Sequence, residues 1–320
     1  MDAVSVSQAT REKTQAALSS VIAAVGLTTF KIIVGVMTGS LGILAEAAHS
    51  GLDLVAALVT FLAVRISGKP ADEEHLYGHG KVENLSALFE TLLLLATCVW
   101  IIYEAYQRLF VQHVEVEVSI WAFIVMAVSI VIDATRSRVL ANAAKKHNSQ
   151  ALEADALHFS TDIWSSSVVI AGLVCVTLSK TISGLNFLKQ ADAVAAVGVA
   201  FIVIFVSLEL GVRTVKGLLD SVPEGLVEKV TDKVLSIPGV TDCHKVRIRP
   251  SGAHIFIDAH VVMEGSLSLE EAHAVTEHIQ AEVRNIIPDV DFTVHAEPPK
   301  KSARAVEPAK SRSKNSKKAA

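Results

Sequence analysis

The sequence predicts an α-helical membrane protein with six transmembrane helices and a C-terminal cytoplasmic α+β domain of αββαβ order. Three observations lead to this fold class. Of the 320 residues, 51% are hydrophobic and 19% are charged, the mean hydropathy is +0.45, and the apolar character ends near Val212. This balance is too apolar for a soluble protein of this length, so it indicates an integral membrane protein that carries a soluble domain.

Six apolar stretches are each close to the ~20 residues that a helix needs to cross a bilayer. They cover residues 15–38, 41–66, 85–103, 118–140, 159–178 and 191–212. We therefore expect four regions: a cytoplasmic N-terminus (1–14), a six-helix transmembrane domain (15–212), a cytoplasmic domain (213–298) and a disordered basic tail (299–320). We expect no signal peptide, because the first stretch is longer and begins more polar than a cleavable segment.

The distribution of lysine and arginine predicts the orientation. These residues collect before the first stretch, between the second and third, and between the fourth and fifth, whereas the alternate loops carry fewer of them. Because positively charged loops stay on the cytoplasmic side, both termini are expected in the cytoplasm.

The C-terminal region alternates between two periodicities. Residues 223–236 have the apolar spacing of an amphipathic helix, and residues 245–261 alternate as two strands around a turn at Ser251 and Gly252, which predicts a β-hairpin. Ser268 and Glu271 have the spacing of a capping box before a second helix, and a last strand is expected from Val290. The tail beyond it is basic and lacks apolar periodicity, which favours proximity to a lipid surface over nucleic-acid binding.

Two His-x-x-x-Asp pairs lie inside apolar stretches. His49 and Asp53 form the first pair, and His158 and Asp162 form the second. Spacing of i, i+4 places both members of a pair on one helix face, and ionisable groups in hydrocarbon are tolerated when they meet each other, water or an ion. A single such histidine could be a packing residue, but the repeated pair predicts a site for a divalent metal, zinc first. Asp155, one turn earlier, is either at the mouth of this site or at a solvated helix start.

The loop between the second and third stretches is rich in histidine and acid. Asp72, His75 and His79 could reach one ion in a turn that Gly78 and Gly80 allow. A solvated loop is the alternative.

The C-terminal domain holds a further set of candidate metal ligands. Two of them, His295 and Glu297, are two residues apart and so share a strand face, as binding of one ion requires. Surface histidines without a metal are the alternative. The full set is His244, His260, His273, His295 and Glu297.

Three segments together resemble the cation diffusion facilitator family, close to its bacterial zinc and iron efflux branch. They are residues 39–53 (GSLGILAEAAHSGLD), residues 77–83 (YGHGKVE) and residues 158–162 (HFSTD). The resemblance extends from about residue 10 to 298. It implies a homodimeric divalent cation/proton antiporter in a bacterial inner membrane, a secondary transporter and not an enzyme.

The resemblance also implies roles for the candidate residues. His49, Asp53, His158 and Asp162 would form the transport site. Asp72, His75 and His79 would form a loop site. The five C-terminal candidates would bind metal at a dimer interface, where Glu297 replaces the usual aspartate. Lys81 and Asp220 would link the membrane helices to the cytoplasmic domain. Many bacterial relatives carry aspartate where this chain has His49, so the resemblance favours Zn²⁺ as both substrate and regulatory ligand, with Cd²⁺, Co²⁺ and Fe²⁺ as further candidates.

Three other functions compete with transport. A metal sensor or scaffold of the same fold is expected to have a degraded intramembrane tetrad, and here all four residues are present. A channel needs weak or multiple sites, which a buried cage of four ligands does not provide. An enzyme has little support, because the sequence has neither a nucleophile paired with a base nor a glycine-rich phosphate loop.

Overall fold

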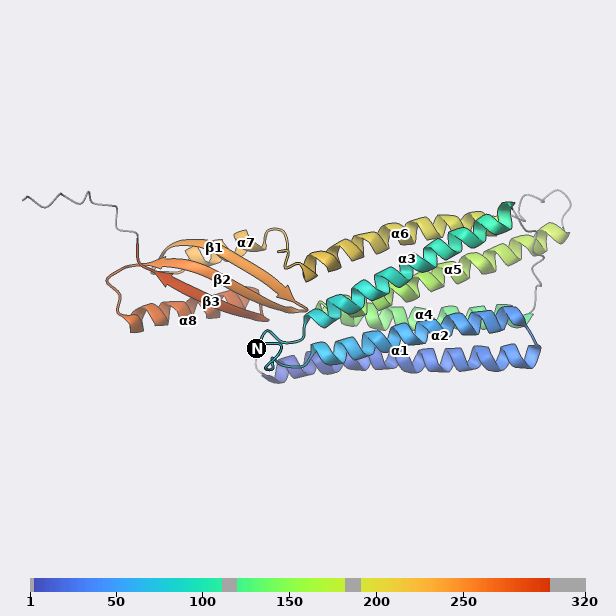
Figure 1. The fold of residues 1–320 in the computed structure, drawn as a ribbon, viewed down its shortest axis with the longest axis horizontal. Coiled ribbons are helices and arrows are strands. Elements are labelled where there is room, and N and C mark those ends of the chain that lie inside the picture. Colours follow the sequence, from blue (N-terminus) through green and yellow to red (C-terminus); the bar gives the residue numbers. More distant parts are fainter. Residues whose placement is uncertain (1–2, 111–119, 182–190, 300–320) are drawn as a thin grey trace, which may run out of the picture.

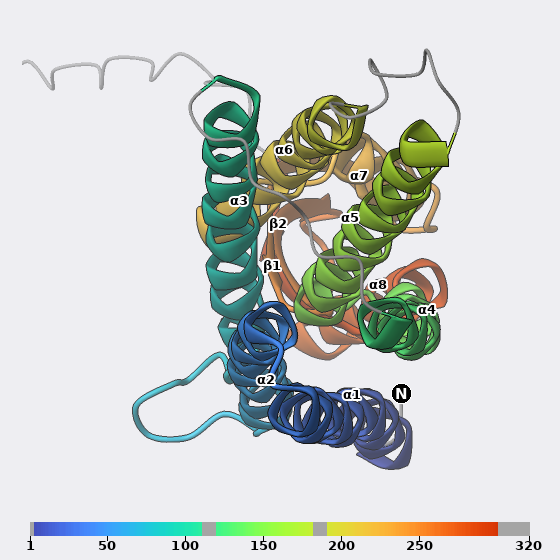
Figure 2. The ribbon, with the colours of Figure 1, turned by 90° about the vertical axis from the view of Figure 1, so that its right-hand side faces the viewer.

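The computed structural model describes residues 3–110, 120–181 and 191–299, in which a set of long helices is followed by a small mixed domain (Figure 1). The expected basic tail lies outside the described residues, apart from its first residue. The six long helices are α1 (Ala3–Thr38), α2 (Leu41–Ser67), α3 (Lys81–Phe110), α4 (Ile120–His147), α5 (Gln150–Thr181) and α6 (Ala191–Leu218). Seen along their axes, α3, α5 and α6 lie on one side and α1, α2 and α4 on the other (Figure 2).

Within the described residues, five helices are long and apolar enough to cross a membrane. These spans are Gln8–Thr38, Leu41–Ser67, Lys81–Gln107, Ile120–His147 and Val197–Leu218. The prediction of six spans is thus supported for five. The remaining helix, α5, has 32 residues and is long enough to cross, but part of its apolar second half lies outside the residues whose side chains are described, so the sixth span is not tested there.

The long helices continue past the apolar stretches that predicted them. The predicted separate N-terminus (1–14) is mostly part of α1, which begins at Ala3, and α3 begins at Lys81. Buried polar contacts hold these helix ends together. Glu83 is 1% exposed, lies 2.5 Å from the ammonium of Lys13 and accepts a hydrogen bond from Ser149. A charge pair of this kind lets polar helix ends pack beside the apolar segments.

The C-terminal domain has the predicted αββαβ order. It contains α7 (Leu226–Leu235), β1 (Val240–Ser251), β2 (His254–Met263), α8 (Leu269–Ile286) and β3 (Val290–Glu297). The strands form one sheet in the order β1-β2-β3. The β1–β2 hairpin is antiparallel, whereas β3 runs parallel to β2 because α8 carries the chain back across the sheet. Ser268 and Glu271 form the predicted capping box at the start of α8.

Both small helices pack on the same face of this sheet. Val230 and Val234 of α7 and Ile279 and Val283 of α8 join one core with the inward residues of the strands. In β2 the buried positions alternate from Ile257 to Met263, so the residues between them lie on the opposite, open face. This open face is free to present polar side chains.

A β-bulge in β1 decides which residues reach the open face. The register with β2 shifts between His244 and Arg247, and Lys245 has a positive φ of 51°. Cys243 and Ile248 are both buried in the core although they are five residues apart, a spacing that places them on opposite faces of a regular strand. The bulge therefore turns His244 onto the open face.

The loop between α2 and α3 lies against the tip of the β1–β2 hairpin. A Cβ at Gly80 would lie 2.2 Å from the carbonyl oxygen of Ser251, so the two backbones touch. The ring of Tyr77 meets Phe256 edge-on with centroids 5.2 Å apart, and the guanidinium of Arg249 lies 3.6 Å from the centre of the Tyr77 ring. These contacts join the helical part of the molecule to its C-terminal domain.

Candidate metal centres

The two intramembrane pairs meet where α2 and α5 are in contact. His158 Nε2 lies 3.1 Å from Asp53 Oδ1 and 3.6 Å from Asp162 Oδ2. Asp53 is 8% exposed and His158 is 5% exposed, so water can reach little of either side chain. The structure thus brings one imidazole and two carboxylates into a cluster whose ligand atoms all lie within 4.8 Å of one another. Such a donor set suits a divalent metal that accepts nitrogen and oxygen.

His49, the fourth predicted member, lies at the edge of this cluster. Its Nε2 is 3.9 Å from Asp53 Oδ1, and its side chain is 41% exposed. It shares a helix face with Asp53 as the i, i+4 spacing requires. His49 therefore lies beside the cluster, but it is not part of the group whose ligand atoms all lie within 4.8 Å of one another.

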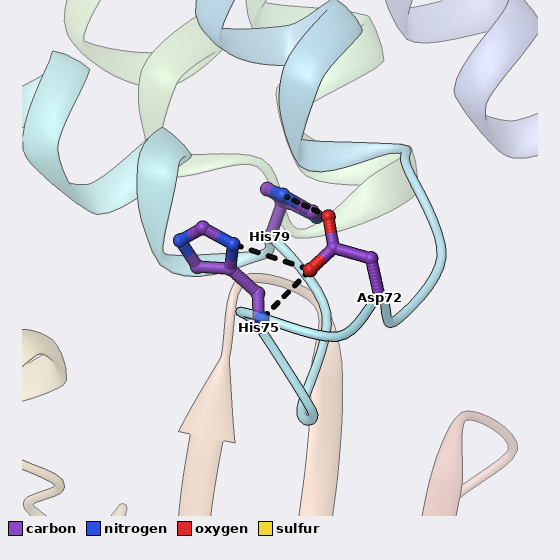
Figure 3. A group of neighbouring side chains, drawn as sticks. All are labelled: Asp72, His75 and His79. Atoms are coloured by element: carbon purple, nitrogen blue, oxygen red, sulfur yellow. Dashed lines mark hydrogen bonds and ion pairs between the residues drawn. The ribbon is translucent and has the colours of Figure 1, made fainter.

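The loop candidates form a second cluster (Figure 3). Asp72 contacts both imidazoles, with one oxygen 3.4 Å from His75 Nδ1 and the other 3.4 Å from His79 Nε2. The two rings are 4.4 Å apart. The backbone N–H of His75 donates a 2.7 Å hydrogen bond to the Asp72 carboxylate, and this bond is the main cause that lowers the pKa of Asp72. The aspartate is therefore kept in the charged form that binds metals.

The C-terminal candidates form a third cluster on the open face of the sheet. His244, His260 and His295 lie opposite one another on β1, β2 and β3. Glu297 is their shared carboxylate: its oxygens lie 2.6 Å from His260 Nδ1, 3.5 Å from His244 Nε2 and 3.8 Å from His295 Nε2. Three imidazoles and one carboxylate therefore come from three adjacent strands. The hydrogen bond from His260 is the main cause that lowers the pKa of Glu297.

His273 is not brought to this cluster by the folding of one chain. It lies on α8, which packs on the opposite face of the sheet from the other four candidates. Its side chain is 70% exposed, and its Nε2 lies 3.6 Å from Glu277. Only a second polypeptide chain could bring this imidazole to the open face of the first.

Lys81 and Asp220, the predicted link between the two parts of the molecule, are in contact. The Lys81 ammonium lies 2.8 Å from Asp220 Oδ1 and donates a hydrogen bond to the carbonyl oxygen of Leu218. The two side chains are 41% and 45% exposed. In a single chain this pair is therefore half-exposed, and its contribution to stability is small because water screens it.

Comparisons with known proteins agree with a helical membrane domain followed by a small C-terminal domain. The sequence profile for the cation efflux transmembrane domain matches residues 17–219, and the profile for the cation efflux protein cytoplasmic domain matches residues 222–299. The chain belongs to the cation diffusion facilitator family.

Curated members of this family match along most of the chain. The cation-efflux pump FieF of Yersinia enterocolitica is 32% identical over 286 residues, which cover 88% of this chain and 92% of the relative. The FieF pump of Citrobacter koseri is 33% identical and covers 89% of this chain and 92% of the relative. A solved structure of CzrB in its zinc form has a TM-score of 0.24 and 23% identity, and covers 27% of this chain and 98% of that chain.

Membership of this family identifies the class of activity. This cation diffusion facilitator is a multi-pass membrane protein that transports cations out of a compartment, and it is a transporter and not an enzyme. The resemblance read from the three motifs is thus confirmed.

Several buried polar residues of this cation diffusion facilitator were not singled out by the sequence. Glu90 is fully buried and lies 3.8 Å from the Nδ1 edge of His158. Lys31 donates a 2.7 Å hydrogen bond to Ser50. Asp155, by contrast, was a predicted candidate; it is fully buried, so the interpretation of Asp155 as a solvated helix start is wrong. Lys31 and Glu90 could have been found in the sequence, because each is an ionisable residue inside an apolar stretch, where such residues are rare and often functional.

The lowered pKa of Glu297 leads to a first prediction. His260→Ala should raise the Glu297 pKa toward the ordinary value of 4.5, because the hydrogen bond that favours the carboxylate is lost. Because folding lowers this pKa, the ionised Glu297 contributes to the free energy of unfolding. This contribution is fully present above pH 4.5 and is lost as the pH falls through the lowered pKa. An NMR titration of the labelled Glu297 carboxyl in the metal-free protein measures the shift.

His278→Ala is the matched control for this titration, because His278 is exposed on α8, which packs on the opposite face of the sheet from Glu297, and is not among the candidate ligands. It should leave the Glu297 titration unchanged. A wild-type Glu297 that titrates at or above 4.5 would contradict the assigned hydrogen bond.

Proposed function

We propose that this cation efflux protein is a Zn²⁺/H⁺ antiporter that exports zinc from the cytoplasm by alternating access, with Cd²⁺, Co²⁺ and Fe²⁺ as further candidate substrates. The observation that supports this most strongly is the meeting of Asp53, His158 and Asp162 between α2 and α5, with His49 beside Asp53. Two imidazoles and two carboxylates suit zinc better than they suit ions that prefer only oxygen ligands.

The same donors explain how protons drive export. An imidazole binds a metal only when its ring is neutral, so a proton and a metal ion compete for the same nitrogen. A site that faces the cytoplasm binds zinc and releases protons. The site then faces a more acidic exterior, where protonation of His49 or His158 expels the ion. The proton gradient thereby supplies the free energy for zinc efflux.

We further propose the arrangement of this protein in its membrane. It is a homodimer in a bacterial inner membrane with both termini in the cytoplasm, residues 15–212 forming the membrane domain and residues 213–298 the cytoplasmic domain. Three observations support this proposal: the basic residues of alternate loops, the bacterial FieF relatives, and the position of His273, which only a partner chain could bring to the open face of the sheet.

Zinc is also proposed as a regulatory ligand. The row of His244, His260 and His295 on the open face, together with Glu297, supports a site between two cytoplasmic domains. Zinc that bridges these domains would favour one arrangement of the dimer and thereby bias the membrane helices, provided that it binds the two arrangements with different affinity.

A metal sensor or scaffold that does not transport is the alternative function. It would need the clusters of the loop and the C-terminal domain but not the intramembrane one. The burial of Asp53 and His158 favours transport, because two ionisable groups enclosed between membrane helices are costly unless they serve a bound ion.

The transport site gives a second prediction. Asp53→Ala or Asp162→Ala should abolish zinc uptake into inverted proteoliposomes, because each change removes a carboxylate ligand that water cannot replace. The dimer should remain folded, as judged by size-exclusion chromatography. Asp232→Ala, at an exposed position of α7, is the control and should transport normally. Near-wild-type uptake by either site variant would remove the cluster from the mechanism.

Proton coupling gives a third prediction. In proteoliposomes with equal zinc on both sides, an imposed pH step should drive net zinc flux toward the acidic compartment, because protons displace zinc there. A zinc-sensitive dye trapped in the vesicles follows the flux. Flux that is indifferent to the direction of the pH step would rule out antiport.

The regulatory site gives a fourth prediction. In the double variant His260→Ala, His295→Ala, the initial transport rate should follow a simple saturation curve as zinc on the cytoplasmic side is raised. Wild type should deviate from such a curve, because in wild type zinc also bridges the two cytoplasmic domains. The intramembrane site of the double variant is untouched, so the maximal rate should stay within about twofold of wild type. An unchanged zinc dependence would argue against regulation by this cluster.

A further inference from the structure

A third carboxylate lies directly behind the proposed transport site. Glu90 of α3 is fully buried, and its Oε2 lies 3.8 Å from His158 Nδ1. The opposite edge of the same imidazole, Nε2, faces Asp53 and Asp162. The His158 ring therefore lies between two ligand carboxylates on one side and Glu90 on the other.

Glu90 is held in this position from α2. Thr60, which is fully buried, donates a 3.1 Å hydrogen bond to Glu90 Oε1 and lies 3.4 Å from the hydroxyl of Ser86. This leaves Oε2 for the imidazole. Among the described residues, Glu90 Oε2 and His158 Nδ1 are both buried and neither has a hydrogen-bond partner, an expensive condition for two polar atoms that face each other.

A small movement satisfies both atoms. A hydrogen bond between a ring nitrogen and a carboxylate oxygen has a length of about 2.9 Å, so the two groups must approach by roughly 1 Å. The neutral imidazole has one N–H donor and one acceptor nitrogen. When Nδ1–H donates to Glu90, the free lone pair is on Nε2, the atom that faces the two ligand carboxylates.

We infer that Glu90 is a positioning residue of the transport site, which accepts a hydrogen bond from His158 Nδ1 and so directs the Nε2 lone pair of His158 toward the metal ion. This inference rests on the proposed function. A carboxylate behind a metal-bound histidine fixes the ring orientation and raises the basicity of the ligand nitrogen. Glu90 is not a further direct ligand in this arrangement, because it meets the edge of the ring that points away from Asp53 and Asp162.

Through Glu90, α3 takes part in a site that otherwise belongs to α2 and α5. Glu90 contacts Thr60 of α2 and His158 of α5, so the three helices meet at one carboxylate. Any rearrangement that moves α3 relative to α5 changes the support of His158, and with it the affinity of the site for zinc.

Zinc binding by the purified full-length protein tests this role. The loop and C-terminal clusters are first disabled by Asp72→Ala, His79→Ala and His260→Ala, so that calorimetric titration with zinc alone reports the intramembrane site. In this background Glu90→Ala should raise the zinc Kd about 10–100-fold. Glu90→Gln should have a smaller effect, because its amide oxygen can still accept the Nδ1–H hydrogen bond but carries no charge.

Two further measurements separate positioning from a purely structural role. Glu90→Gln should raise the KM for zinc transport with little change in the maximal rate, and its melting temperature without metal should match that of the background protein. Glu104→Gln makes the same chemical change on the same helix, 14 residues away or about 21 Å along the axis, and should leave the Kd unchanged.

The possible results distinguish this inference from the proposed function itself. Unchanged zinc affinity in both Glu90 variants, with binding abolished by Asp162→Ala, would overturn the role of Glu90 and leave the transport site intact. Normal zinc affinity in Asp162→Ala would instead overturn the transport site. Weakened binding in the Glu90 variants and in Asp162→Ala, but not in Glu104→Gln, supports both.

Discussion

The contact between α2 and α5 is governed by the cost of enclosing ionisable side chains between apolar helices. Asp53 and His158 are almost fully buried, and their 3.1 Å contact crosses the boundary between the two helices. Neither group could remain charged alone in such surroundings, because the loss of hydration costs several kcal/mol per ion. The polar cluster therefore fixes which faces of α2 and α5 meet, and a divalent cation bound there, as proposed, would satisfy the carboxylates of Asp53 and Asp162.

The same constraint recurs along the helical part of the molecule. Lys13 forms an ion pair with Glu83. Lys31 contacts Ser50 and Glu46. Arg136 forms an ion pair with Asp133, and its guanidinium lies 3.5 Å from the centre of the Phe159 ring. Each cation is buried with a partner. Such pairs add little net stability compared with apolar packing, but breaking one leaves an uncompensated charge. They hold the helices in a defined register around the metal cluster.

The loop between α2 and α3 carries one candidate metal cluster and also touches the C-terminal domain. Asp72, His75 and His79 lie within it, and its residues Tyr77 and Gly80 touch the β1–β2 hairpin. The helix that leads into the loop carries Asp53, and the helix that follows it carries Glu90. A metal ion bound by Asp72, His75 and His79 would therefore order a segment that contacts the C-terminal domain and joins the helices that carry Asp53 and Glu90.

The sequence by itself determined five of the membrane helices, the αββαβ order and the capping box, and it indicated most of the ligand candidates, because all of these follow from local periodicity and spacing. His49 shares a face with Asp53, and His295 with Glu297, for the same reason. Only the tertiary structure decided which of these residues meet. A bulge at Lys245 turns His244 toward His260, the packing of α8 removes His273 from that row, and α3 brings Glu90 to the back of His158. These outcomes depend on strand register and helix packing between segments far apart in the chain, and local spacing does not encode them.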